Sequence, residues 1–137
     1  MKIAVIGGGS WATALVKIVT ENNGSIGWWI RNDENIEHLK LHRHNANYLR
    51  SVELPIERIH LSSDINEIVE SADCLIFAIP SAFLKTALSN LSVDISQKLI
   101  FSAIKGIVPD ENLIVGEFFN EKYNIPLESI GVISGPC

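Results

Sequence analysis

Apolar residues follow two different spacings along this chain. Short continuous apolar runs bounded by turn residues predict buried strands, and apolar residues at every third or fourth position predict helices. The runs that predict strands lie at residues 2–6, 25–30, 59–61, 74–79, 99–104 and 130–133. The helical spacing lies at residues 10 to about 21, 33 to about 41, 64–70, 83–91 and 111–123.

Strands and helices therefore alternate along the whole chain. Strands that are apolar throughout, each followed by a helix, predict a parallel sheet with helices on both faces. Residues 43–58 show little periodicity and contain Pro55, so we expect an irregular segment there. The pattern predicts an α/β fold, a Rossmann-type doubly wound and mainly parallel sheet, in one domain over residues 1–137.

The turn between the first strand and the first helix is rich in glycine and reads Gly7-Gly8-Gly9-Ser10-Trp11-Ala12. In turns of this kind one glycine permits the tight turn and a second leaves room for a pyrophosphate. A third small residue lets the helix pack closely on the strand. Gly7, Gly9 and Ala12 stand at these positions, and free N–H groups near Ser10 and Trp11 would bind the phosphates. A plain tight turn is the alternative, but the flanking strand and helix favour a dinucleotide site.

The end of the second strand indicates which dinucleotide would bind. An acid that binds the ribose 2′-OH is expected there, about 20 residues after the glycine turn. This chain has Arg31, followed by Asn32 and Asp33. A guanidinium can pair with a 2′-phosphate and stack on adenine, so NADP is favoured, while Asp33 keeps NAD open. The alternative is that Arg31 is only a solvated charge at the strand end.

Composition argues against several other classes of protein. The 137 residues hold 16 Asp and Glu against 11 Lys and Arg, a net charge of −5, which argues against nucleic acid as the main partner. No apolar run approaches the roughly 18 residues of a membrane span, and the N-terminus enters a strand without a signal peptide. Cys74 and Cys137 give neither a disulfide framework nor a metal-ligand spacing, so we expect a cytoplasmic protein.

His38, His42 and His44 lie close together in the sequence, and the first two are one helical turn apart. A metal site is one interpretation of this group. No carboxylate or cysteine completes it, so a solvated helix end is favoured and we expect no metal.

Two later segments add chemistry at the ends of strands. Residues 102–107 place Lys105 after the fifth strand, and residues 134–137 follow the last one. Ligands of such sheets bind beyond the carboxyl ends of the strands. Lys105 could hold a carbonyl or a phosphate there, although a single loop lysine is more often a solvated charge.

Several motifs follow one another in an order typical of one family. They are Gly7-x-Gly9-x-Trp11-x-Thr13-Ala14-Leu15, Trp29 to Arg31, Asn45-x-x-Tyr48-Leu49, Leu54-Pro55, Asp64, Ala72-Asp73, Ala78-Ile79-Pro80-Ser81, Lys105-Gly106-Ile107 and Ser134-Gly135-Pro136. Over essentially its whole length the chain resembles the N-terminal half of bacterial-type NAD(P)-dependent glycerol-3-phosphate dehydrogenase. Trp11, the lysine motif at 105–107 and the motif at 134–136 are together the most specific part of the resemblance.

The resemblance implies reduction of dihydroxyacetone phosphate to sn-glycerol 3-phosphate for phospholipid synthesis, with NADP or NAD as cofactor. The positions that match cofactor-binding residues are Gly7, Gly9, Ser10, Trp11, Arg31, Asn32, Tyr48, Phe83 and Lys105. The positions that match substrate-binding residues are Lys105, Gly135 and Cys137. Core packing is the alternative role for Trp11 and Phe83, and loop anchoring is the alternative role for Tyr48.

The chain also departs from the family. Ala12 replaces the usual glycine, and Cys137 stands where serine or threonine is typical, so a weaker hydrogen bond to substrate is expected. The family's second, helical domain carries the lysine that acts as acid and base, and no residue here matches it. Hydride transfer needs a held substrate and a proton donor. We therefore expect a fragment that binds cofactor without turnover, with its C-terminal domain as partner and a homodimer left open.

Two other interpretations stay open on the sequence. A dehydrogenase of the 3-hydroxyacid or ketopantoate type would share the glycine turn but not the motifs at 105–107 and 134–136. A nucleotide-sensing module usually keeps an acid at the end of the second strand and has no need of Lys105.

Overall fold

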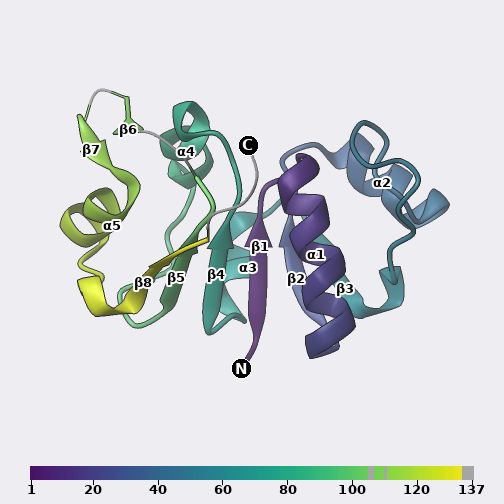
Figure 1. Ribbon diagram of the computed structural model, residues 1–137, viewed down its shortest axis with the longest axis horizontal. Coiled ribbons are helices and arrows are strands. Elements are labelled where there is room, and N and C mark those ends of the chain that lie inside the picture. Colours follow the sequence, from purple (N-terminus) through teal and green to yellow (C-terminus); the bar gives the residue numbers. More distant parts are fainter. Residues whose placement is uncertain (105–106, 110, 134–137) are drawn as a thin grey trace.

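The computed structural model describes residues 1–104, 107–109 and 111–133. In these residues one parallel sheet has the strand order β3-β2-β1-β4-β5-β8 (Figure 1). Its strands are β1 Ile3–Ile6, β2 Ile26–Trp29, β3 Ile59–Ser62, β4 Cys74–Phe77, β5 Leu99–Ser102 and β8 Ile130–Val132. The chain runs outward from β1 to β3, returns to β4 and runs outward on the other side. The predicted Rossmann-type sheet is confirmed, and its order reverses between β1 and β4.

Helices connect the strands. They are α1 Ser10–Asn23, α2 Asp33–His42, α3 Ile65–Glu70, α4 Ser81–Leu88 and α5 Val115–Tyr123. Two short 3₁₀ turns, Ile56–Arg58 and Leu127–Ser129, lead into β3 and β8. None of the helices in the described residues is long and apolar enough to cross a membrane.

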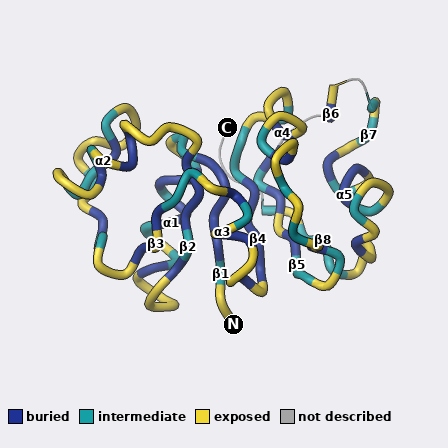
Figure 2. Tube along the Cα trace, turned by 180° about the vertical axis from the view of Figure 1, so that it is seen from behind, coloured by how far each residue is buried: buried dark blue, intermediate teal, exposed yellow. Residues whose placement is uncertain are grey.

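The strand residues alternate between two hydrophobic cores on the two faces of the sheet. Figure 2 shows β1, β2 and β4 as largely buried. On one face Val5, Trp28 and Ile76 pack with residues of α1 and α2. On the other face Leu75 and Phe77 join residues of α3, α4 and α5. Central strands of this sheet are therefore apolar throughout because both of their faces are buried.

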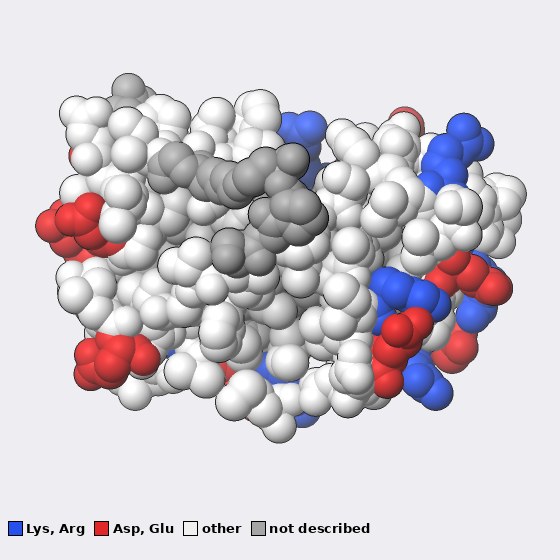
Figure 3. Space-filling view, viewed as in Figure 1, with Lys and Arg blue, Asp and Glu red and all other residues white. Residues whose placement is uncertain are grey.

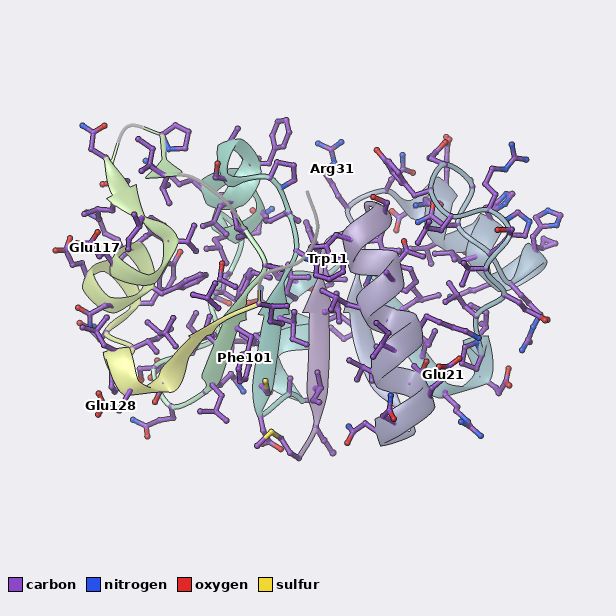
Figure 4. All side chains as sticks on the ribbon, viewed as in Figure 1. Trp11, Glu21, Arg31, Phe101, Glu117 and Glu128 are labelled. Atoms are coloured by element: carbon purple, nitrogen blue, oxygen red, sulfur yellow. The ribbon has the colours of Figure 1, made fainter. Side chains whose placement is uncertain are left out.

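One part of the sheet differs from the prediction that helices cover both faces. Figure 1 shows α1 in front of β1 and β2, and no described helix lies in front of β4, β5 and β8. Phe101 of β5 lies on this face, next to Ile76, and is 36% exposed (Figure 4). Its ring covers Gly131, where an added Cβ would lie 2.6 Å from Cε1 of Phe101. Where described atoms are visible over these strands, Figure 3 shows mostly uncharged side chains.

A second difference lies at residues 111–123, where the sequence predicts one helix. Leu113–Ile114 instead forms a short strand, β7, which pairs antiparallel with β6 at Ile107–Val108. The helix begins only at Val115. Within α5, Val115, Phe118 and Phe119 follow the helical spacing, and all three are buried in the core. A two-residue strand has no periodicity of its own, so the apolar pattern of the sequence did not distinguish β7 from the helix that follows it.

Candidate functional site

The glycine turn lies directly against the end of β4. Gly7 has a φ of +132°, a conformation that glycine alone adopts readily. A Cβ at this position would overlap the carbonyl oxygen of Ala78 and lie 2.7 Å from Cγ2 of Ile79. A Cβ on Gly9 would meet nothing within 4 Å. Gly7 is therefore required by the fold, whereas Gly9 borders open space at the N-terminus of α1.

The carbonyl groups of this turn are held by donors from the protein. Gly9 O accepts hydrogen bonds from the Thr13 N–H at 2.9 Å and from Thr13 Oγ1 at 2.7 Å. Gly8 O accepts one from Asn45 Nδ2 at 3.1 Å, and Gly7 O accepts one from the buried Trp28 Nε1. Carbonyl oxygens held in this way are not free to approach an anion.

The N-terminus of α1 is suited to bind an anion. Its first-turn N–H groups have no acceptor within the helix, and the helix dipole places partial positive charge there. Gly9 at the N-cap makes no side-chain cap, and the first turn carries no acidic residue. Nothing in α1 itself therefore competes with a phosphate for these groups.

A cleft of about 1100 Å³ opens at the carboxyl ends of β1 to β5. The eight predicted cofactor residues within the described part of the chain all line it: Gly7, Gly9, Ser10, Trp11, Arg31, Asn32, Tyr48 and Phe83. They come from turns and from the first turns of α1 and α4, which are distant in the sequence, and Figure 4 shows Trp11 and Arg31 at the same edge of the sheet. Lys105, Gly135 and Cys137 lie outside the described residues, although Ala103 and Ile104 line the cleft.

Arg31 and Asp64 are the charged residues of the cleft wall in the described ranges. The carboxylate of Asp64 has a structural role, because its Oδ1 accepts a hydrogen bond from the Asn66 N–H and caps α3. Asn32 likewise caps α2, its Oδ1 accepting from the N–H groups of Glu34 and Asn35. Arg31 is exposed, so among the described residues of this wall its guanidinium is the positive group available to a ligand.

Aromatic side chains stand at the rim of the cleft. Phe83 is 57% exposed and Tyr48 is 47% exposed, so core packing does not explain Phe83. Trp11, in the first turn of α1, is half-buried and packs against one of the two cores, so packing and ligand contact are compatible for it. Exposed aromatic faces at a cleft are typical of sites that bind planar rings.

The sequence did not identify every residue of the site. Ser63 and Ile65 line the cleft after β3, and Thr86 and Asn90 line it from α4 and the turn that follows. Asn45 lies behind the glycine turn and is fully buried. The Asn45-x-x-Tyr48-Leu49 motif was the available signal for Asn45, but a motif does not reveal which backbone groups a side chain holds.

Comparison with known proteins decides the family. Residues 2–137 match a family model described as the N-terminus of NAD-dependent glycerol-3-phosphate dehydrogenase. The chain belongs to this family. It is 33% identical over 137 residues to glycerol-3-phosphate dehydrogenase [NAD(P)+] of Bacillus licheniformis, covering 98% of this chain and 39% of that protein. A relative of the same description from Pseudomonas fluorescens (strain SBW25) is 32% identical over 134 residues, covering 98% of this chain and 38% of that protein.

A solved glycerol-3-phosphate dehydrogenase structure from Plasmodium falciparum superposes with a TM-score of 0.85 at 28% identity. It matches 98% of this chain and 40% of its own chain. The chain thus spans about two fifths of the length of the dehydrogenases that it matches, and its similarity to them is that of an N-terminal domain.

His38, His42 and His44 form a cluster of rings at the C-terminal end of α2. The ring centroids lie 4.5 Å apart for His38 and His42 and 5.0 Å apart for His38 and His44. No group of three or more His, Cys, Asp or Glu in the described ranges could hold a metal ion. Burial, followed by the positive charges that His42, His44 and Arg50 can carry, lowers the pKa of His38 below its ordinary value.

The lowered pKa of His38 predicts a pH dependence of stability. The neutral ring is favoured in the folded chain, so this contribution is present above the ordinary histidine pKa of about 6.5 and is lost as the pH falls. We expect the urea concentration at the midpoint of unfolding to decrease as the pH is lowered from about 7.5 to about 5.5. The decrease should be smaller in His38→Gln.

His60 supplies the control for this measurement, because its ring pairs with Glu67 at 2.7 Å. His60→Gln removes a histidine outside the group His38, His42 and His44, so it should leave the fall at about the wild-type value. An equal fall in wild type and His38→Gln would contradict the assignment.

Proposed function

We propose that this chain binds NAD(P) in the cleft and serves the reduction of dihydroxyacetone phosphate to sn-glycerol 3-phosphate. The observation that carries the proposal is the glycine turn, whose carbonyl groups are held by Thr13, Trp28 and Asn45 beside the open N-terminus of α1. The family membership of the chain supports the same function. The biological role would be the supply of glycerol 3-phosphate for phospholipid synthesis in the cytoplasm.

The pyrophosphate would lie at the N-terminus of α1, against Gly9 and the N–H groups of Ser10 and Trp11. The adenosine end would lie toward Arg31 and Asn32, where Arg31 favours the 2′-phosphate of NADP over the free hydroxyl of NAD. Tyr48 and Phe83 would contact the cofactor from the rim. The residues present therefore suit a dinucleotide along the whole cleft.

The substrate would lie beyond the nicotinamide end of the cleft. Bound NAD(P)H supplies the hydride that reduces the C2 carbonyl. Lys105 would contact both cofactor and substrate and would orient and polarise that carbonyl as a compact cation. Gly135 and Cys137 would complete the substrate contacts.

The proton donor for this reaction would come from a second, helical domain. The mostly uncharged face of β4, β5 and β8 around Phe101 would receive that domain, because apolar sheet faces are normally covered. A homodimer of the whole enzyme is compatible with this arrangement. On this proposal the 137-residue chain binds the cofactor but does not turn over.

The test is to titrate the purified chain with NADPH and with NADH, and then to add dihydroxyacetone phosphate and follow NAD(P)H absorbance. We expect saturable binding and no oxidation of the cofactor, since the proposed proton donor belongs to the second domain. Turnover at a normal enzymatic rate would contradict the proposed need for a second domain. Binding of neither cofactor would contradict the proposed function itself.

A further inference from the structure

The side chain of Asn45 links three parts of the chain behind the glycine turn. It is fully buried, although it lies in the irregular segment that follows α2. Its Nδ2 donates to Gly8 O at 3.1 Å and to Thr13 Oγ1 at 3.0 Å. Its Oδ1 accepts from the Asn47 N–H at 2.9 Å and from the Tyr48 N–H at 3.2 Å. One amide thus connects the glycine turn, α1 and the loop that carries Tyr48.

The hydrogen-bonding capacity of this amide is fully used. A primary amide offers two N–H donors and two carbonyl lone pairs, and Asn45 has a partner for each. A buried polar side chain that is fully satisfied fixes its partners in one arrangement. No other residue type has the size and the mixed donor and acceptor character to make these four bonds from the same position.

The bonds of Asn45 have consequences on two walls of the cleft. Holding Gly8 O keeps that carbonyl from turning toward an anion at the N-terminus of α1. Holding the Tyr48 N–H places the loop on which Tyr48 reaches the rim. Thr13 continues the same chain of bonds, because its hydroxyl accepts from Asn45 and donates to Gly9 O.

We propose that Asn45 is a positioning residue for cofactor binding, which sets the pyrophosphate turn and the Tyr48 wall through one side chain. The proposal rests on the proposed binding of NAD(P) in this cleft. Asn45 does not touch the cofactor itself. Its effect on affinity comes from preorganisation, because a turn that must be ordered during binding lowers the affinity.

The sharpest variant is Asn45→Asp. It has the same shape and keeps both acceptor bonds to the 47–48 backbone, but it places an oxygen against Gly8 O instead of a donor. We expect the NADPH affinity of the folded variant to fall about tenfold or more, as for the loss of a buried hydrogen bond. Affinity is measured by titration under conditions where circular dichroism shows the variant to be folded.

Asn120→Ala is the matched control. Asn120 also bonds a backbone carbonyl, that of Ile125 at 2.9 Å, but it lies on α5 away from the cleft. Asn120→Ala should lower the urea concentration at the midpoint of unfolding and leave the NADPH affinity at the wild-type value. A loss of stability alone, without a loss of affinity, is what a merely structural role of Asn45 would give.

Thr13→Val provides a second variant if Asn45→Asp does not fold. Valine has nearly the same shape, keeps the backbone bond to Gly9 O and removes the hydroxyl that joins Asn45 to it. A drop in affinity in Thr13→Val supports the proposal, and wild-type affinity in the folded variants overturns it. If the wild-type chain binds neither NADPH nor NADH, the proposed function fails and this proposal fails with it.

Discussion

Gly7→Ala is expected to unfold much of the chain and to abolish cofactor binding. The backbone at Gly7 has a φ of +132°, and an added Cβ would overlap Ala78 O, directly after β4. Strain in such a conformation and overpacking each cost about 1–3 kcal/mol, so we expect a loss of about 2–6 kcal/mol in the free energy of unfolding. Urea denaturation followed by circular dichroism measures this loss.

Gly9→Ala is the informative comparison for Gly7→Ala. Gly9 has a φ of −84°, and its Cβ would meet nothing within 4 Å. The stability should change by only about 1 kcal/mol or less, the difference between glycine and alanine at an N-cap. The new methyl group would stand where the pyrophosphate is proposed to lie, so NADPH affinity should fall in a folded protein. Wild-type stability in Gly7→Ala, or wild-type affinity in Gly9→Ala, would contradict this account of the turn.

Arg31→Glu is expected to reverse the cofactor preference. Arg31 is exposed on the cleft wall after β2, directly before Asn32, the N-cap of α2. Its replacement removes a charge-assisted bond to the 2′-phosphate and adds repulsion, while a carboxylate can accept from the ribose hydroxyls of NADH. We expect NADPH affinity to fall by about 10- to 100-fold and NADH affinity to be kept or raised.

Arg58→Glu is the control for this charge reversal. Arg58 is exposed at the short turn before β3 and does not line the cleft. Arg58→Glu changes the net charge by the same amount as Arg31→Glu, so any general electrostatic effect on cofactor binding appears in both variants. An unchanged ratio of the two dissociation constants in Arg31→Glu would refute the proposed role of Arg31.

The strands and the glycine turn could be predicted because their causes are local. A run such as Cys74 to Phe77 is buried on both faces, so each residue must be apolar and the run is visible in the sequence. The turn at Gly7 needs a residue type that the sequence shows directly. The helical spacing from residue 10 to about 21 corresponds to α1, which ends at Asn23 where Gly24 takes a positive φ.

Other features depend on contacts between distant residues and could not be predicted. Asn45 bonds a carbonyl 37 residues away, and no local pattern marks such a bond. The short strands β6 and β7 exist only because they pair with each other. Phe101 looks like any apolar strand residue, yet it lies on the face that no described helix covers.

This chain is proposed to hold NAD(P) at the N-terminus of α1, and a fluorescence titration of the wild-type chain with NADPH tests this binding most directly. Trp11 lies on the cleft wall, so its emission should be quenched saturably as NADPH binds, and excess ADP-ribose should reverse the quenching. Gly9→Ala should shift the same curve to higher concentration. The absence of saturable quenching together with no rise in the unfolding midpoint at high NADPH would contradict the claim, since any ligand that binds the folded state stabilises it.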